Sequence, residues 1–118
     1  MTDLIACLST GKGTWGNVKR IIEEGKWNNI FLFSNDFGKE NFKIETKSEI
    51  IVIDARKPMN ELIDEIKKSI KDKVEGTEVA LNLISGSGKE HMALITAIIQ
   101  LGLSFRLVAL TTEGIKEL

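Results

Sequence analysis

The sequence predicts a three-layer α/β fold, in which helices cover both faces of a mainly parallel sheet of five or six strands. Short runs of aliphatic and β-branched residues alternate along the chain with longer amphipathic stretches. Each run is continuously apolar, which is typical of strands that are buried on both faces. Strands and helices that alternate in this way form parallel sheets. With 118 residues the chain has the length of a single domain, 1–118.

Two strands and one helix are predicted in the first part of the chain. The strands are the apolar runs of residues 4–8 and 29–34. Between them, residues 15–22 place apolar side chains near helical spacing, and Gly25 is a plausible terminator. Residues 35–49 are polar and charged, so we expect a surface connection with a short helical turn, or a lid over the strand ends.

The middle of the chain predicts a third strand, a helix and a fourth strand. Residues 50–54 are the third apolar run, and Pro58 fits the first turn of a helix that extends to about Lys73. Its apolar residues recur at steps of three and four, and the opposite face, which includes Glu65, is charged. We interpret that face as solvated. Residues 79–84 form the fourth strand.

The next predicted helix, residues 89–101, is apolar on nearly every side. Such a helix must be buried against more than one neighbour, and in so small a domain the second cover is expected from another subunit. The sequence therefore predicts a homodimer. Residues 103–110 follow as a fifth strand, and residues 111–118 are expected to be a short tail.

Composition excludes several classes of function. Sixteen basic and seventeen acidic residues give a net charge of −1, which argues against binding along duplex nucleic acid. The single cysteine, Cys7, lies in an apolar run and is expected to be a buried thiol in a reducing compartment. No zinc-type ligand spacing is present, and no apolar run is long enough to span a bilayer or to act as a secretion signal. We therefore expect a cytoplasmic protein without a membrane partner.

A glycine turn after the fourth strand is the main candidate site. Residues 85–88, Ser-Gly-Ser-Gly, lead directly into the helix that begins near Lys89. Glycine allows close approach of the backbone to a ligand, and the first turn of a helix presents N–H groups without intrahelical partners. With the lysine ammonium, this arrangement suits a phosphate group. The alternative interpretation is a tight connection followed by a solvated lysine.

In a parallel sheet the carboxyl ends of the strands share one edge, where ligands of open α/β sheets bind. Four segments are expected on that edge: residues 9–13, 34–36, 54–56 and 85–89. Two of them are glycine turns, which favours a phosphate site over a structural connection.

Two nucleotide motifs compete for this interpretation. Residues 11–16, Gly-Lys-Gly-Thr-Trp-Gly, match the G-x-G-x-x-G pattern of dinucleotide sites, and Asp36 follows about twenty residues later. A P-loop is a weaker match, because Leu83 stands where its first glycine is required and Glu90 replaces the hydroxyl residue that holds magnesium.

The segment from Asn82 to Met92, Asn-Leu-Ile-Ser-Gly-Ser-Gly-Lys-Glu-His-Met, resembles the signature of the CRISPR-associated Rossmann fold (CARF) family. Members of that family carry an Asn-x-Thr-Gly-Gly-Thr-Lys type of sequence after the fourth strand of a small Rossmann-like domain. They also carry a hydroxyl residue after the first strand, which Ser9-Thr10 matches. This chain departs from the pattern at Ser87, which replaces the second glycine, at Gly88, which replaces the threonine, and at Met92, which lies one place later than usual.

The resemblance implies a homodimer that binds cyclic oligoadenylate, such as cyclic tetra-adenylate, across its interface. A stand-alone domain of this kind resembles a ring nuclease, which cleaves the ligand without a metal or another cofactor to products with 2′,3′-cyclic phosphate ends. The catalytic roles of that family map to Lys89 and Ser9. Ligand contacts are then expected in the two turns, at Thr10, Gly11, Lys12, Gly13, Ser85, Gly86, Ser87, Gly88, Glu90 and His91.

Alternatives remain for the function of the chain and for the roles of single residues. The chain could be a non-catalytic sensor or sink that regulates a CRISPR effector, or a dinucleotide-binding regulatory domain. His91 has a suitable ordinary pKa for a general base, but its place on the helix predicts that it points aside. Lys12 and Arg56 are ligand contacts or surface residues, and Trp15 is a stacking platform or a buried anchor.

Overall fold

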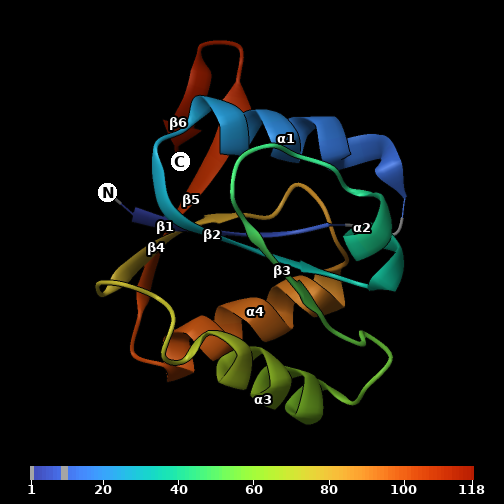
Figure 1. The fold of residues 1–118 in the computed structure, drawn as a ribbon. Helices are drawn as coiled ribbons and strands as arrows, with labels where there is room; N and C mark the ends of the chain where they lie inside the picture. The colour runs from blue at the N-terminus through green and yellow to red at the C-terminus, as the bar shows by residue number, and fades with distance from the viewer. Residues whose placement is uncertain (1, 9–10) are drawn as a thin grey trace.

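The computed structural model describes residues 2–8 and 11–118 of the chain. Strands and helices alternate along it, as Figure 1 shows. The strands are β1 (Thr2–Cys7), β2 (Trp27–Ser34), β3 (Glu49–Val52), β4 (Glu78–Asn82), β5 (Ser104–Thr111) and β6 (Gly114–Glu117). The α-helices are α1 (Trp15–Glu24), α2 (Asp36–Asn41), α3 (Met59–Ile70) and α4 (Gly88–Gln100), and a short 3₁₀ helix, η1 (Lys12–Thr14), precedes α1.

The strands form one sheet of six, in the order β3-β2-β1-β4-β5-β6. The first five are parallel, and β6 pairs with β5 in the antiparallel direction. The sheet is therefore mainly parallel, as the continuous apolar runs predicted. After β3 the chain crosses to the other side of β1 and continues outward, so the strand order reverses between β1 and β4. Ligand sites of open α/β sheets lie at such a reversal, outside the carboxyl ends of the strands.

Alternate residues of β1 enter two separate apolar clusters. Leu4 and Ala6 pack with the buried residues of α1, and Ile5 and Cys7 pack with those of α3 and α4. Figure 1 accordingly shows α1 on one side of the sheet and the other two helices together on the opposite side. Because successive side chains of a strand point to opposite faces, a central strand covered in this way must be apolar at every position.

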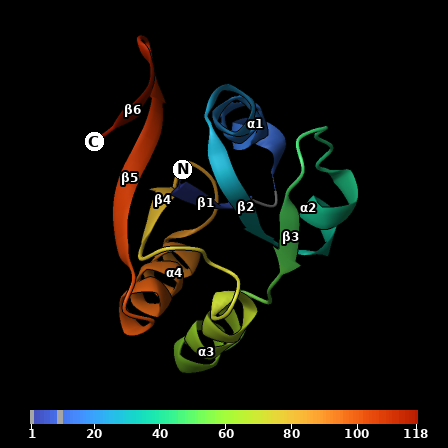
Figure 2. The ribbon, with the colours of Figure 1, turned by 60° about the vertical axis from the view of Figure 1, so that its left-hand side comes forward.

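Two segments that the sequence analysis left without a strand or a full helix are regular. The expected tail contributes β6, which folds back along the edge strand β5, and Figure 2 shows this pair at one side of the sheet. Residues 35–49 contain α2, a longer element than the expected helical turn. The Asn35 side chain caps it by accepting a hydrogen bond from the Gly38 N–H at 2.9 Å.

The apolar helix α4 is covered on its inner side only. Ala93, Leu94, Ala97 and Ile98 are buried in the cluster that α4 shares with α3 and the sheet. On the outer side, Met92 and Ile99 are exposed at 63% and 59%; Leu107 of β5 and Ile84 before α4 are further exposed apolar side chains. Within the described residues, no helix has both the length and the apolar character needed to cross a bilayer.

Candidate functional site

The two strands that precede the glycine-containing turns, β1 and β4, end side by side at the carboxyl edge of the sheet. Ala6 of β1 pairs with Asn82 of β4 in parallel register, so both strands end at the same level. The turn after β4 also touches β1, because a Cβ placed on Gly86 would lie 2.9 Å from the Cβ of Cys7. Ser9 and Thr10 of the first turn lie outside the described residues. Their predicted roles therefore stay predictions.

The described part of the first turn is exposed and is held by aromatic rings. Gly11 and Gly13 have open space where a Cβ would stand. Between them, the Lys12 ammonium lies 5.9 Å from the ring centroid of Trp15 and 5.8 Å from that of Phe37. Trp15 is itself buried, so its interpretation as an anchor of the first helix is confirmed. A cation at such distances from ring faces is weakly attracted to them, which favours a position of the lysine beside Phe37 of α2.

The second turn depends on a glycine in the left-handed region. Gly86 has φ +100°, a conformation that residues with a side chain rarely adopt. The buried Ser85 precedes it, and the Ser85 carbonyl accepts a hydrogen bond of 2.8 Å from Nε2 of His91. His91 therefore points back across the turn and carries its proton on Nε2. In this conformation that nitrogen stabilises the turn and is not available as a base.

A capping box occupies the start of α4. Ser87 Oγ accepts from the Glu90 N–H at 3.2 Å, and Glu90 Oε1 accepts from the Ser87 N–H at 2.8 Å. Two of the N–H groups expected to face an anion are thus already paired, and a carboxylate stands beside them. The N–H groups of Gly88 and Lys89 have no hydrogen-bond partner among the described residues. The anion-binding capacity of this turn is therefore concentrated at Gly88 and Lys89.

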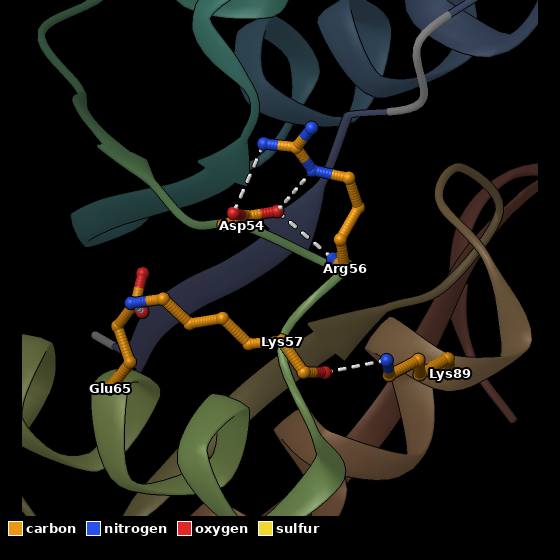
Figure 3. Close-up of polar contacts among 5 residues, drawn as sticks. All are labelled: Asp54, Arg56, Lys57, Glu65 and Lys89. Carbon is orange, nitrogen blue, oxygen red and sulfur yellow. Dashed lines mark hydrogen bonds and ion pairs between the residues drawn. The ribbon is translucent and has the colours of Figure 1, made fainter.

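The Lys89 side chain reaches from α4 to the loop that follows β3. Its Nζ donates a hydrogen bond of 2.6 Å to the carbonyl oxygen of Lys57, as Figure 3 shows. The ammonium thus lies at the positive end of the α4 dipole and joins the fourth strand–helix unit to the third. To bind a ligand phosphate, the ammonium of Lys89 would have to give up its hydrogen bond with the Lys57 carbonyl.

A cavity of about 510 Å³ lies at the carboxyl ends of β1, β2 and β3. It lies on the edge that the sequence predicted, and Glu90 of the capping box belongs to its wall. Its lining residues are Leu8, Asn35, Asp36, Val52, Ile53, Asp54, Ala55, Arg56, Glu65 and Glu90. Among the described residues, no group of three or more His, Cys, Asp or Glu side chains is arranged to hold a metal ion.

Two ion pairs lie at this cavity. Asp54 accepts from Nε of Arg56 at 3.0 Å and from Nη2 at 3.3 Å, and Glu65 pairs with Lys57 at 2.5 Å (Figure 3). The hydrogen bonds from the Arg56 side chain and backbone N–H hold the pKa of the Asp54 carboxyl below its ordinary value of 3.8. Asp54 is therefore a carboxylate at neutral pH.

Cys7, which ends β1, is a core residue and not a nucleophile. Burial raises the pKa of its thiol from 9.0 to about 12, and the nearby negative charge of Glu90 adds to this effect. The thiolate needed for nucleophilic attack is absent at physiological pH. The predicted buried thiol is confirmed.

Sequence reasoning missed two features of this edge. The capping box has a sequence signal, because Ser87 is followed three residues later by Glu90. This spacing indicates the start of a helix and predicts that the Glu90 side chain pairs with the backbone N–H of Ser87. Glu65 has no such signal. It lies on the charged face of α3 that the sequence assigned to solvent, and the fold places it at the cavity wall.

Comparison of the chain with protein-family models finds none that matches, and comparison with curated proteins finds no match either.

Proposed function

We propose that this chain is a three-layer, Rossmann-like domain of the CARF kind that binds cyclic oligoadenylate as a homodimer and cleaves it without a metal. One observation carries the proposal. The turn before α4 presses against the end of β1, where Gly86 leaves no room for a Cβ beside Cys7. The second glycine turn is thereby held next to the end of the strand from which the first one departs. The order reversal between β1 and β4 supports the same location.

The cleavage requires geometry and charge more than protein nucleophiles. A ribose 2′-oxygen attacks the adjacent phosphorus, the bond from phosphorus to the 5′-oxygen breaks, and the 2′-hydroxyl proton leaves as the 5′-oxygen gains one. The products are a 2′,3′-cyclic phosphate and a 5′-hydroxyl. Negative charge develops on the phosphoryl oxygens, where the Gly88 and Lys89 N–H groups and the Lys89 ammonium would stabilise it. Ser9 would hold the phosphodiester in line.

The exposed apolar side of α4 supports the proposed dimer. Met92 and Ile99 lie two turns apart on one side of the helix, and both are more than half exposed. A second copy packed there through a two-fold axis would bury both residues and bring two copies of the turn together around a symmetric ligand. The mass of the protein in solution tests this point: we expect a dimer, and Ile99→Lys should yield the monomer. A monomeric wild-type protein would contradict it.

The main test is chromatography of cyclic tetra-adenylate after incubation with the protein in EDTA. We expect linear products with cyclic phosphate ends, and a loss of roughly a hundredfold to a thousandfold in turnover for Lys89→Ala. The matched control is Lys19→Ala, which removes an exposed lysine of α1 and should leave turnover unchanged. A loss below about threefold for Lys89→Ala would contradict its catalytic role. Tight binding without any product would identify a sensor or sink instead.

A second candidate, a dinucleotide-binding regulatory domain, rests on a separate observation. The segment Gly11 to Gly16 follows β1 and extends through η1 into the first turn of α1, and Asp36 follows β2 and lines the cavity. In dinucleotide sites an acidic residue near this place binds the ribose hydroxyls. Binding of NAD in the absence of binding to any cyclic adenylate would favour this candidate.

A further inference from the structure

We propose that the cavity at the ends of β1, β2 and β3 binds the nucleoside part of the ligand, with adenine and ribose inside and phosphate outside. The inference rests on the proposed function, which puts a phosphodiester at Gly88 and Lys89. The cavity volume of about 510 Å³ lies within the range of about 300–1,000 Å³ usual for small-molecule sites. It also lies beside the reversal in strand order, where open α/β sheets bind ligands.

The apolar part of the lining suits the flat faces of a base. Leu8 and Ile53, at the ends of β1 and β3, are buried, and Val52 and Ala55 beside Ile53 are partly buried. A lining that combines aliphatic side chains with a few polar groups is usual for a pocket that binds an amphipathic small molecule.

The charged part of the lining excludes phosphate. The lining contains four carboxylates and one guanidinium, that of Arg56, so it carries net negative charge; the carboxylates are those of Asp36, Asp54, Glu65 and Glu90. An ionised carboxylate accepts hydrogen bonds and donates none. The cavity therefore selects a group that donates, such as a ribose hydroxyl or the exocyclic amine of adenine, and repels a phosphate.

Several acceptor oxygens remain available after the internal pairs are counted. Arg56 occupies both oxygens of Asp54, Lys57 occupies Oε2 of Glu65, and the Ser87 N–H occupies Oε1 of Glu90. Asp36, together with the second oxygens of the two glutamates, has no hydrogen-bond partner among the described residues. Four acceptor oxygens at one cavity, two on Asp36 and one on each glutamate, match the several donors of an adenine nucleoside.

Glu90 connects the cavity to the proposed phosphate site. Its carboxylate lines the cavity and also pairs with the Ser87 N–H in the cap of α4. A nucleoside on one side of this side chain and a phosphodiester on the other would belong to one continuous ligand. The negative cavity and the positive helix start would then orient that ligand in a single direction.

The test is titration of the ¹⁵N-labelled protein with adenosine, inosine or inorganic phosphate, followed through its amide resonances. Adenosine at millimolar concentration is expected to shift the amides of Asp36 and of residues 52–56. Inosine carries a carbonyl oxygen in place of the amine and should bind at least fivefold more weakly. Phosphate should shift Gly88 and Lys89 and leave residues 52–56 unchanged.

Asp36→Asn should weaken adenosine binding about fivefold to tenfold, whereas Asp64→Asn, the same change outside the cavity on α3, should not. The absence of shifts from adenosine, equal affinity for inosine, or phosphate shifts at residues 52–56 would overturn the inference. If the protein cleaves cyclic tetra-adenylate but adenosine shifts amides outside the cavity, the inference is wrong and the proposed function stands. Adenosine shifts at the cavity without binding of the cyclic ligand would overturn the proposed function alone.

Discussion

Carboxylates at the two ends of the parallel strands differ in their burial and in their hydrogen bonds. At the amino end, Asp3 of β1 is completely buried and accepts from the Asn29 N–H and Nδ2 at 3.1 Å and from the Glu75 N–H at 2.8 Å. At the carboxyl end, Asp36 is exposed and Glu90 is partly exposed, with one oxygen in the helix cap. The first carboxylate joins three segments of the chain. The others leave acceptors facing a cavity.

The difference separates polar groups that stabilise the fold from polar groups that can bind. A buried carboxylate whose hydrogen bonds are all made within the chain holds its segments together and has nothing to offer a ligand. A carboxylate with an oxygen that has no hydrogen-bond partner in the chain contributes little to the stability of the fold. Such an oxygen can accept a hydrogen bond from a ligand. We therefore expect substitutions at the amino end to change the free energy of unfolding, and substitutions at the carboxyl end to change binding.

The largest expected effect is that of Asp3→Ala. The change removes the buried acceptor of the partly buried backbone N–H groups of Asn29 and Glu75, and it should lower the free energy of unfolding by about 2–4 kcal/mol. Asp36→Ala, at the exposed start of α2, should cost less than about 1 kcal/mol. Urea denaturation measures both values. Equal losses for the two variants would remove the contrast between the ends.

The next effect concerns two glycines of one turn. Gly86→Ala places a Cβ against Cys7 at φ +100°, and we expect a loss of about 2 kcal/mol in unfolding free energy. Gly88→Ala, where a Cβ meets nothing within 4 Å, should change it by less than about 1 kcal/mol. Thermal denaturation of the two variants measures their melting temperatures, and we expect a lower value for Gly86→Ala than for Gly88→Ala. Similar melting temperatures would mean that the close approach to β1 is unimportant.

Cys7 marks the boundary between core and open edge, and its effect depends on pH. Its folded pKa of about 12 exceeds the unfolded value of 9.0, so the stability it contributes is complete below pH 9 and is lost as pH rises toward 12. Between pH 8 and pH 10 the unfolding free energy should fall by about 1.4 kcal/mol more in wild type than in Cys7→Ala. Parallel pH profiles of the two proteins in urea denaturation would show that the thiol is not enclosed.

The smallest expected effect is local to the cavity rim. Arg56 holds the pKa of Asp54 below 3.8, so Arg56→Ala should raise that pKa toward its ordinary value. Arg20→Ala, which removes the partner of Glu24 on α1, should leave it unchanged. Carboxyl ¹³C shifts followed between pH 2 and pH 6 give both values. An unchanged pKa in Arg56→Ala would show that the pair is absent in solution.

Much of the fold was predictable, because its elements are encoded by local patterns. The runs at β1, β2 and β4 are apolar at nearly every position, which few structures other than central strands require. Strand order is not encoded in this way, because the sequence of a strand that is buried on both faces does not indicate which strands pair with it. The edge strand β6 escaped prediction because Gly114–Glu117 is short and half polar. Its pairing depends on β5 rather than on its own pattern.

The site was predictable to a smaller extent. A glycine turn before a helix indicates where an anion can bind, and Gly86 in that turn has a positive φ. The direction of a long side chain depends on tertiary neighbours, so the contact of Lys89 with the Lys57 carbonyl could not be foreseen. The cavity is also tertiary, since Asp36 and Glu65 reach it from separate helices.

The most direct test of the account is to locate the binding of cyclic tetra-adenylate by its effect on the amide resonances of the labelled protein. We predict shifts at Gly88, Lys89 and the cavity residues 52–56, with Asp3, Asn29 and Glu75 at the amino end unchanged. Shifts that gather at the amino end, or no shifts at a ligand concentration well above micromolar, would contradict the claim that the carboxyl edge is the functional one.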